Sequence, residues 1–332
     1  MIAYLAGELS CGLTFLDWSL YYFSGVQHFY NPLSKSWETL TKDPVSIVNA
    51  HKHNKIHPPS LDLLKHCIDD INNTTTSFHS IYVSPKISDN GVDISKFLRD
   101  DVYDNNNKWN DEIRRLPNEI IINMNNFLIE QNYKLLILRN NKEDILYNMF
   151  NRGRAFDSTS DDELMKLYTK FFGEESAEWG DNLKIWDYRE KLALSIRPFD
   201  YEHFDITISK TNHYEITTKD MLDNLDKEIY NILDFFNITP ANDFDYWKSI
   251  YIKWQQLHDV RFYRNWPEII NNIVEGDDID LSDYRMDFSK DVFIQHILLY
   301  NYNLNIKGYG IEALPKNTKL IHDLLEPNIH KL

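Results

Sequence analysis

The first residues of the chain combine small side chains and glycines in a pattern that can bind phosphate. An apolar run, Ile2–Ala6, leads directly into Gly7–Trp18, and this order is typical of a strand, a tight loop and a helix. Such a turn directs unpaired N–H groups and a partial positive charge at one spot, where an anion can bind. Gly7 and Gly12 have the spacing of G-x-x-x-x-G-K-[ST], but Leu13 replaces its lysine. The segment therefore predicts a phosphate-binding turn unlike that of ordinary ATPases and kinases.

This turn resembles the phosphosulfate-binding loop of sulfotransferases, which has the form G-x-P-K-S-G-T-T-W-L. Aligned at Gly12, the two loops share a small residue before the glycine, a threonine two residues after it, and an aromatic-leucine pair. The resemblance implies a P-loop fold and the cofactor 3′-phosphoadenosine 5′-phosphosulfate (PAPS). The residues expected to hold the 5′ end of this cofactor are Ser10, Cys11, Gly12, Leu13, Thr14 and Phe15.

Ser10 is the main departure from the family, which has lysine or arginine at this position. A neutral hydroxyl cannot neutralise charge on the leaving phosphate as a cation does. We expect a substitute cation from Lys35, Lys52 or Lys55, with the loop 51–57 favoured. Without one, the chain is expected to bind the nucleotide but to transfer sulfate poorly.

A second segment has an arginine at the end of an apolar strand. Residues Tyr133–Leu138 are followed by Arg139 and then by a helix start, which resembles the sulfotransferase segment V-V-Y-V-A-R-N-P-K-D-V-A-V-S. In that family the arginine and the serine hold the 3′-phosphate, so the resemblance assigns this role to Arg139, with Tyr147 near the place of the serine. The planar guanidinium suits a phosphate because it makes paired, charge-assisted bonds. The alternative is a basic residue that only caps the strand end.

A third segment supports the architecture more than the chemistry. Residues Tyr214–Leu222 and Ile229–Ile238 resemble the family's V-x-Y-E-D-L segment and the helix that follows it. Apolar residues recur at i, i+3, i+4 and i+7 from Ile229, as on the buried face of any amphipathic helix. The three segments occur in the family's order over roughly half of the chain. They also resemble the divergent sulfotransferase-like proteins of marine phages, which implies a viral source.

Histidines are the candidate catalytic bases, because sulfuryl transfer to a hydroxyl requires a group that accepts its proton near neutral pH. His51 and His53 lie in a polar, histidine-rich loop, and His79 lies at the second expected strand. The family often has its catalytic histidine on that strand. We expect one of the three to act, while an exposed polar loop remains the alternative for the first two. No metal is expected, since the loop lacks a thiolate or acidic partner at ligand spacing and carries lysines.

Composition limits the classes of partner. The 332 residues carry a formal charge of −16, which argues against binding nucleic acid or an anionic membrane. The two cysteines, Cys11 and Cys67, form no disulfide framework or metal-ligand pattern. No signal segment and no apolar run of about 20 residues occurs. We therefore expect a soluble, cytoplasmic protein without a membrane span, and leave its oligomeric state open.

The order of elements predicts an α/β, P-loop-type fold with a parallel central sheet, flanking helices and a mostly helical C-terminal half. A single domain is expected over residues 1–332, with insertions around 30–59 and 88–118 and a helical portion around 157–332. Residues 30–59 are expected to be irregular. Strands are expected at 2–6, 78–83, 133–138 and 214–216, and helices at 13–24, 60–71, 218–236 and 244–256.

The family implies transfer of a sulfuryl group from PAPS to a hydroxyl or amine of a small-molecule or carbohydrate acceptor. The nucleotide product would be adenosine 3′,5′-bisphosphate. Two alternatives stay open. One is a non-catalytic descendant that binds a nucleotide or a partner. The other is a P-loop kinase-like enzyme, which would need a phosphate-clamping lysine and a magnesium-holding carboxylate.

Overall fold

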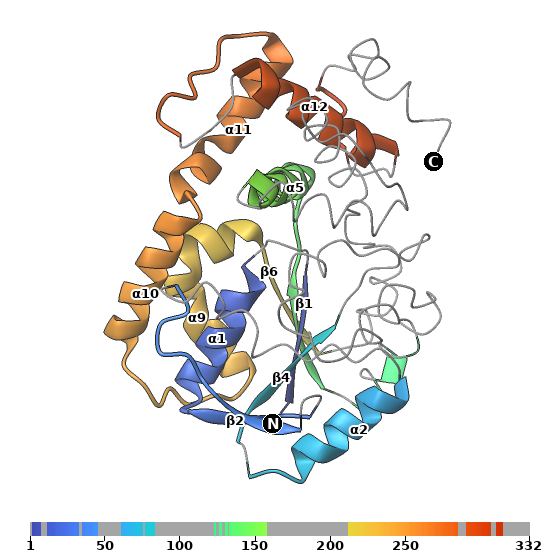
Figure 1. Cartoon of the computed structure of the whole chain (residues 1–332), viewed down its shortest axis with the longest axis vertical. Helices are drawn as coiled ribbons and strands as arrows, with labels where there is room; N and C mark the ends of the chain where they lie inside the picture. The colour runs from blue at the N-terminus through green and yellow to red at the C-terminus, as the bar shows by residue number, and fades with distance from the viewer. Residues whose placement is uncertain are drawn as a thin grey trace, which may run out of the picture. The chain divides into compact units, whose positions relative to one another are not determined.

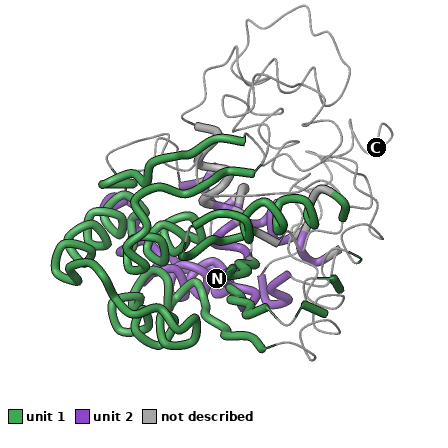
Figure 2. The backbone as a smooth tube through the Cα atoms, turned by 90° about the horizontal axis from the view of Figure 1, so that it is seen from below, with its two compact units in different colours: residues 1–140, 199–260 green, residues 141–198, 261–332 purple. Residues whose placement is uncertain are grey.

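The computed structural model describes a large part of the chain, in two compact units (Figure 2). The first unit comprises residues 1–140 and 199–260, and the second comprises 141–198 and 261–332. The expectation of one domain over the whole chain stays a prediction. The structure describes residues 2–7, 12–32, 35–45, 61–75, 77–83, 123, 126–127, 130–131, 133–157, 212–284, 290–306 and 310–314.

A parallel sheet of four strands forms the centre of the first unit, in the order β4-β1-β5-β6 (Figure 1). Its strands are β1 (Ile2–Gly7), β4 (His79–Val83), β5 (Lys134–Leu138) and β6 (His213–Ile216). All four were predicted to within one or two residues, because each is a short apolar run between turn residues. The expected α/β class with a parallel sheet is confirmed at this level, and its P-loop identity stays a prediction.

The register of the sheet creates a change of direction between β1 and β5. Gly7 at the end of β1 pairs with Leu138 at the end of β5, while β4 pairs with the other side of β1. The next strand of this sheet along the chain, β4, therefore lies on one side of β1, and β5 lies on the other side. In open α/β sheets, ligands bind at the carboxyl ends of the strands at such a switch point.

Helices cover both faces of the sheet, as expected (Figure 1). Helix α2 (Leu61–Asn72) packs one face of β1, β4 and β5 through a core that includes Tyr4, Cys67 and Ile137. The other side carries α1 (Leu13–Phe23), α9 (Leu225–Phe235) and α10 (Phe244–Leu257). These helices were also predicted, with the difference that the segment Asp220–Asn224 before α9 is wound as the π-helix η3.

Stacked aromatic rings join α1 to α10. Phe15 stacks on Trp254 with ring centroids 4.9 Å apart, and the indole nitrogen of Trp247 donates a hydrogen bond to Ser19 Oγ at 2.8 Å. Aromatic pairs of this kind contribute about 0.5–1.5 kcal/mol beyond the area they bury. The start of α1 is thus fixed to the C-terminal turn of α10.

A hairpin of β2 (His28–Asn31) and β3 (Ser36–Thr39) replaces part of the irregular stretch predicted from residue 30 onward. The irregular expectation was wrong here. The hairpin turn uses no glycine: Lys35 adopts the left-handed conformation with φ 52°, a conformation usually signalled by glycine or asparagine. Asn31 also donates to Glu38 across the strands at 2.7 Å.

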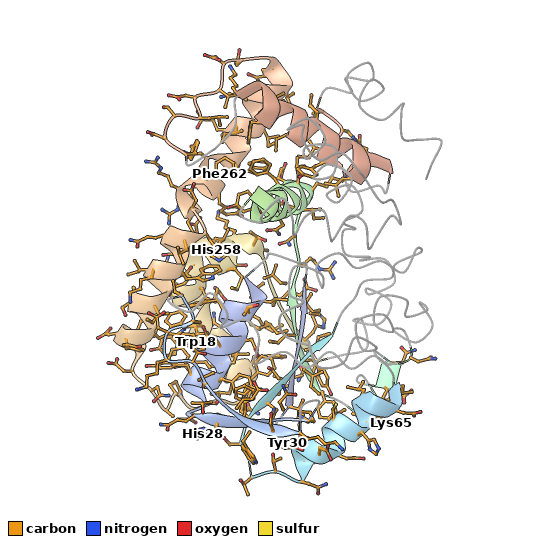
Figure 3. The ribbon with its side chains drawn as sticks, in the orientation of Figure 1. Trp18, His28, Tyr30, Lys65, His258 and Phe262 are labelled. Atoms are coloured by element: carbon orange, nitrogen blue, oxygen red, sulfur yellow. The ribbon has the colours of Figure 1, made fainter. Side chains whose placement is uncertain are left out.

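The second unit contains α5 (Lys142–Asp157), all but the first residue of α11 (Val260–Glu275), and α12 (Lys290–Ile306). Aromatic side chains hold these helices together, with Phe262 of α11 close to α5 (Figure 3). Phe150 of α5 lies 5.8 Å from the ring of Phe262 and 5.1 Å from that of Phe293 on α12. None of the helices that the structure describes is long and apolar enough to cross a membrane.

Candidate nucleotide-binding edge of the sheet

The N-terminus of α1 lies just beyond the carboxyl end of β1. Gly12 is its N-cap, in the left-handed conformation with φ 85° and ψ 3°, and its carbonyl accepts from the N–H groups of Phe15 and Leu16. Gly12 has no side chain that could cap the helix. Among the described residues, the first turn of α1 has no acidic side chain either. An anion beside this turn would meet a partial positive charge that no described carboxylate of the turn offsets.

The surroundings of Gly12 explain why this position is glycine. A Cβ atom there would lie 2.8 Å from Trp254 Cζ2 and 3.0 Å from Met221 Cε. The residues after it divide by burial: Leu13 and Phe15 are core side chains, whereas Thr14 is half-buried. Of Leu13–Phe15, Thr14 is therefore the one whose side chain keeps access to solvent.

Arg139 directly follows β5 at the same edge. Its backbone N–H donates to the carbonyl of Ile216 at 2.7 Å, and its Nε lies 3.2 Å from Glu215 Oε2. One third of the Arg139 side chain is exposed. Gly7 at the end of β1 pairs with Leu138, so Arg139 directly follows the residue that lies beside the end of β1. Gly12 and Arg139, two of the residues expected to contact the nucleotide, thus lie at the same edge of the sheet.

Hydrogen bonds that the sequence analysis missed tie the ends of β5 and β6 together. Asn140 Oδ1 accepts from both the backbone N–H and the hydroxyl of Thr218, at 3.0 and 2.7 Å. Thr217 and Asp220 form a reciprocal cap at the start of the following helix. The sequence signal for this cap was present as T-x-x-D, the pattern of a capping box. These contacts fix the backbone around Arg139.

His79 does not lie at this edge. It pairs with Ile2 at the amino end of β1, about 16 Å from the carboxyl end at the usual rise per strand residue. The side chain is fully buried, its Nδ1 lies 3.3 Å from the hydroxyl of Tyr21, and burial lowers its pKa to about 4. The structure therefore gives His79 a place in the core and does not bring it to Gly12 and Arg139.

Tyr147, expected near the 3′-phosphate, belongs to α5 in the second unit. Its ring is buried and lies 4.9 Å from the ring of Tyr263 and 5.5 Å from that of Trp266. In this unit the side chain is part of an aromatic core.

Several expected site residues lie outside the described residues. These are Ser10, Cys11, His51 and His53, together with Lys52 and Lys55. The third candidate cation, Lys35, lies in the turn between β2 and β3. In the described ranges, no group of three or more His, Cys, Asp or Glu side chains is arranged to hold a metal ion.

A histidine that the sequence analysis did not consider lies near the start of α1. His258 caps the C-terminus of α10, and its ring centroid is 4.4 Å from that of Trp254 (Figure 3). Protein atoms around it lower its pKa to about 4, yet its side chain is exposed, and contact with water opposes so large a shift. With its pKa lowered, the ring is neutral at pH 7. The i, i+4 spacing of Trp254 and His258 was the available signal.

Comparison of the chain with known protein families, with curated proteins and with solved structures found no match. The residues at the sheet edge are therefore the basis for inferring a function.

Proposed function

We propose that the carboxyl edge of the sheet binds PAPS and that the chain transfers its sulfuryl group to a hydroxyl or amine acceptor. The observation that carries this proposal is the pairing of Gly7 with Leu138. Through it, the end of β1 and the residue before Arg139 are neighbours at the switch point, where α/β proteins bind ligands.

The described residues fit a phosphate ester at two points. The first turn of α1 offers a partial positive charge without an acidic side chain of its own, and Arg139 supplies a full charge with partial exposure. In a chain with a net charge of −16, such a local cation matters more than the overall field. Both features support binding of the two phosphate-bearing ends of one nucleotide.

Each group has a distinct role in this proposal. The start of α1 orients the 5′ end, with Thr14 as its accessible hydroxyl, and Arg139 holds the 3′-phosphate. The bound cofactor supplies an activated sulfuryl group. A neutral histidine accepts the proton of the acceptor, and His258 joins His51 and His53 as a candidate because of its position next to Trp254. Positioning and charge stabilisation then supply most of the rate.

A second candidate function is nucleotide binding without transfer. It is favoured by Leu13, which occupies the position of the kinase lysine and is a core side chain, and by Ser10, which replaces the cation of the sulfotransferase loop. Detection of labelled sulfate on an acceptor, in a screen of hydroxyl and amine compounds with labelled PAPS, separates the two functions.

Thermal unfolding with adenosine 3′,5′-bisphosphate, ADP and ATP with magnesium tests the proposed ligand. A ligand at about 100 times its Kd stabilises a protein by about 2.7 kcal/mol. We expect the bisphosphate to give the largest shift because it alone carries a 3′-phosphate. Equal shifts for bisphosphate and ADP, or a larger one for ATP with magnesium, would contradict the proposal.

Arg139→Ala tests the cation itself. We expect it to weaken bisphosphate binding by about 1.5–3 kcal/mol, the scale of a hydrogen bond to a charged group, in isothermal titration calorimetry. Arg261→Ala is the control, since Arg261 is an exposed arginine of the second unit, 3.6 Å from Asp283. Unchanged affinity in Arg139→Ala would move the 3′-phosphate to another residue.

A further inference from the structure

Three side chains form a chain of contacts at the outer strand of the sheet. Glu215 Oε2 lies 3.2 Å from Arg139 Nε, and Glu215 Oε1 lies 3.5 Å from His213 Nε2. One carboxylate therefore contacts both neighbours, each through a different oxygen. The three side chains are all partly exposed, between 30% and 39%.

The strand geometry accounts for this alignment. His213 and Glu215 pair with Leu135 and Ile137 of β5, which belong to the core under α2, so their side chains share that face of the sheet. Tyr214, between them, faces the opposite side, and its hydroxyl donates to Glu228 of α9 at 2.8 Å.

The contact with Glu215 involves the enclosed part of the guanidinium group. Arg139 Nε is buried from solvent, although one third of the whole side chain is exposed. Glu215 thus holds Arg139 on its protein side, and the exposed surface belongs to other atoms of the side chain. Because the guanidinium is planar and rigid, fixing Nε restricts the orientation of the whole group.

We propose that Glu215 is a positioning residue: it fixes the plane of Arg139 at the sheet edge so that the guanidinium can receive the 3′-phosphate, and His213 in turn fixes Glu215. This inference rests on the proposed function. The carboxylate has two opposing effects on a bound phosphate. It orders the arginine, which favours binding, and its like charge repels the phosphate, which disfavours binding.

Two substitutions separate these effects. Glu215→Gln removes the charge and keeps a polar side chain of the same length, whereas Glu215→Ala removes both. Calorimetry with adenosine 3′,5′-bisphosphate and with adenosine 5′-phosphate gives, as the ratio of the two affinities, the contribution of the 3′-phosphate. We expect this ratio to fall about three- to tenfold in Glu215→Ala and to stay at the wild-type value or rise in Glu215→Gln.

Glu228→Gln is the matched control, because Glu228 receives a hydrogen bond from the same strand on the opposite face; it should leave the ratio unchanged. His213→Ala should lower the ratio in the same direction as Glu215→Ala, by a smaller factor. His213→Ala also tests the positioning role if Glu215→Ala does not fold.

An unchanged or increased affinity ratio in Glu215→Ala overturns the positioning role. If Glu215→Ala does not fold, the same result in His213→Ala overturns it. An increase in both Glu215 variants would identify Glu215 as a competitor of the phosphate. Arg139→Ala distinguishes this failure from that of the proposed function. If Arg139→Ala lowers the ratio and Glu215→Ala does not, only the positioning role fails. If Arg139→Ala also leaves the ratio unchanged, the proposed phosphate contact itself fails.

Discussion

At the level of single residues, His79 is a buried imidazole at the amino end of β1, whereas His258 packs on Trp254, a neighbour of Gly12. His79 was expected at the site because it lies on the strand between the two binding segments. A strand assignment does not state which end of the sheet a residue occupies, and the pairing with Ile2 places it at the far end. His258 is distant in sequence from Gly12. The two residues are linked by Trp254, whose ring lies next to both. The i, i+4 spacing signals the contact between Trp254 and His258, but no local pattern signals the approach of Trp254 to Gly12.

The burial of His79 predicts a pH dependence of stability. Burial lowers its pKa from 6.5 to about 4 in the folded protein, so the unfolded chain binds a proton at higher pH than the folded chain does. The free energy of unfolding is therefore highest above the unfolded pKa and falls as the pH decreases towards 4. From pH 7 to pH 5, the free energy of unfolding measured with urea should fall by about 2 kcal/mol in the wild type, and this decrease should be absent in His79→Gln.

His66→Gln is the control for this experiment, because His66 lies on the exposed side of α2; it should keep the wild-type pH dependence. An identical pH dependence in wild type and His79→Gln would show that the buried imidazole does not control acid stability.

At the level of elements, the sequence predicted those whose local pattern is strong. The apolar strands and the amphipathic helices fall in this group. It missed α11, which contains Pro267 and is separated from α10 by Asp259 in the left-handed conformation, with φ 47°. Proline in a helix interior and a left-handed residue other than glycine both oppose the usual local preferences. Packing of Phe262 and Trp266 on Phe150 compensates within the second unit.

The start of α1 predicts a large cost for a single methyl group. Gly12→Ala introduces left-handed strain of roughly 1 kcal/mol and a Cβ atom 2.8 Å from Trp254, an overlap that adds about 1–3 kcal/mol. Gly276→Ala is the matched control: its φ is 78°, and nothing lies within 4 Å of a Cβ there. In urea unfolding, we expect both variants to lose the free energy that corresponds to the left-handed strain. Only Gly12→Ala should lose the additional free energy that corresponds to the overlap with Trp254. Equal losses would mean that Trp254 moves aside freely.

The loop after β5 predicts a smaller but specific effect. Asn140→Ala removes the acceptor of two hydrogen bonds from Thr218 at a buried position, which should lower the free energy of unfolding by about 1–3 kcal/mol. Asn231→Ala, at an exposed position of α9, should change it little. If both variants unfold at the same urea concentration, the loops after β5 and β6 do not depend on this contact.

At the level of the whole molecule, composition and order of elements predicted the α/β class and its parallel sheet, because both follow from the alternation of short apolar runs with helical segments. They could not predict the strand order, since pairing between β1 and β5 joins residues more than 130 positions apart. The candidate site depends on that order. The net charge of −16 is independent of it and acts on any anionic ligand.

This charge predicts how salt should affect nucleotide association. Electrostatic interactions extend over roughly 30 Å at 0.01 M salt and over about 10 Å at 0.1 M, so at low salt the whole acidic molecule repels the bisphosphate, while at higher salt mainly the sheet edge acts on it. We expect the association rate constant, measured by stopped-flow fluorescence with a labelled bisphosphate, to rise over this interval. Proteins with a cationic binding surface show the reverse.

Arg139→Ala separates the local cation from the overall charge. In this variant the association rate constant should still rise with salt, while dissociation of the bisphosphate becomes faster. A rate that falls steeply with salt would instead require a cationic surface that steers the nucleotide.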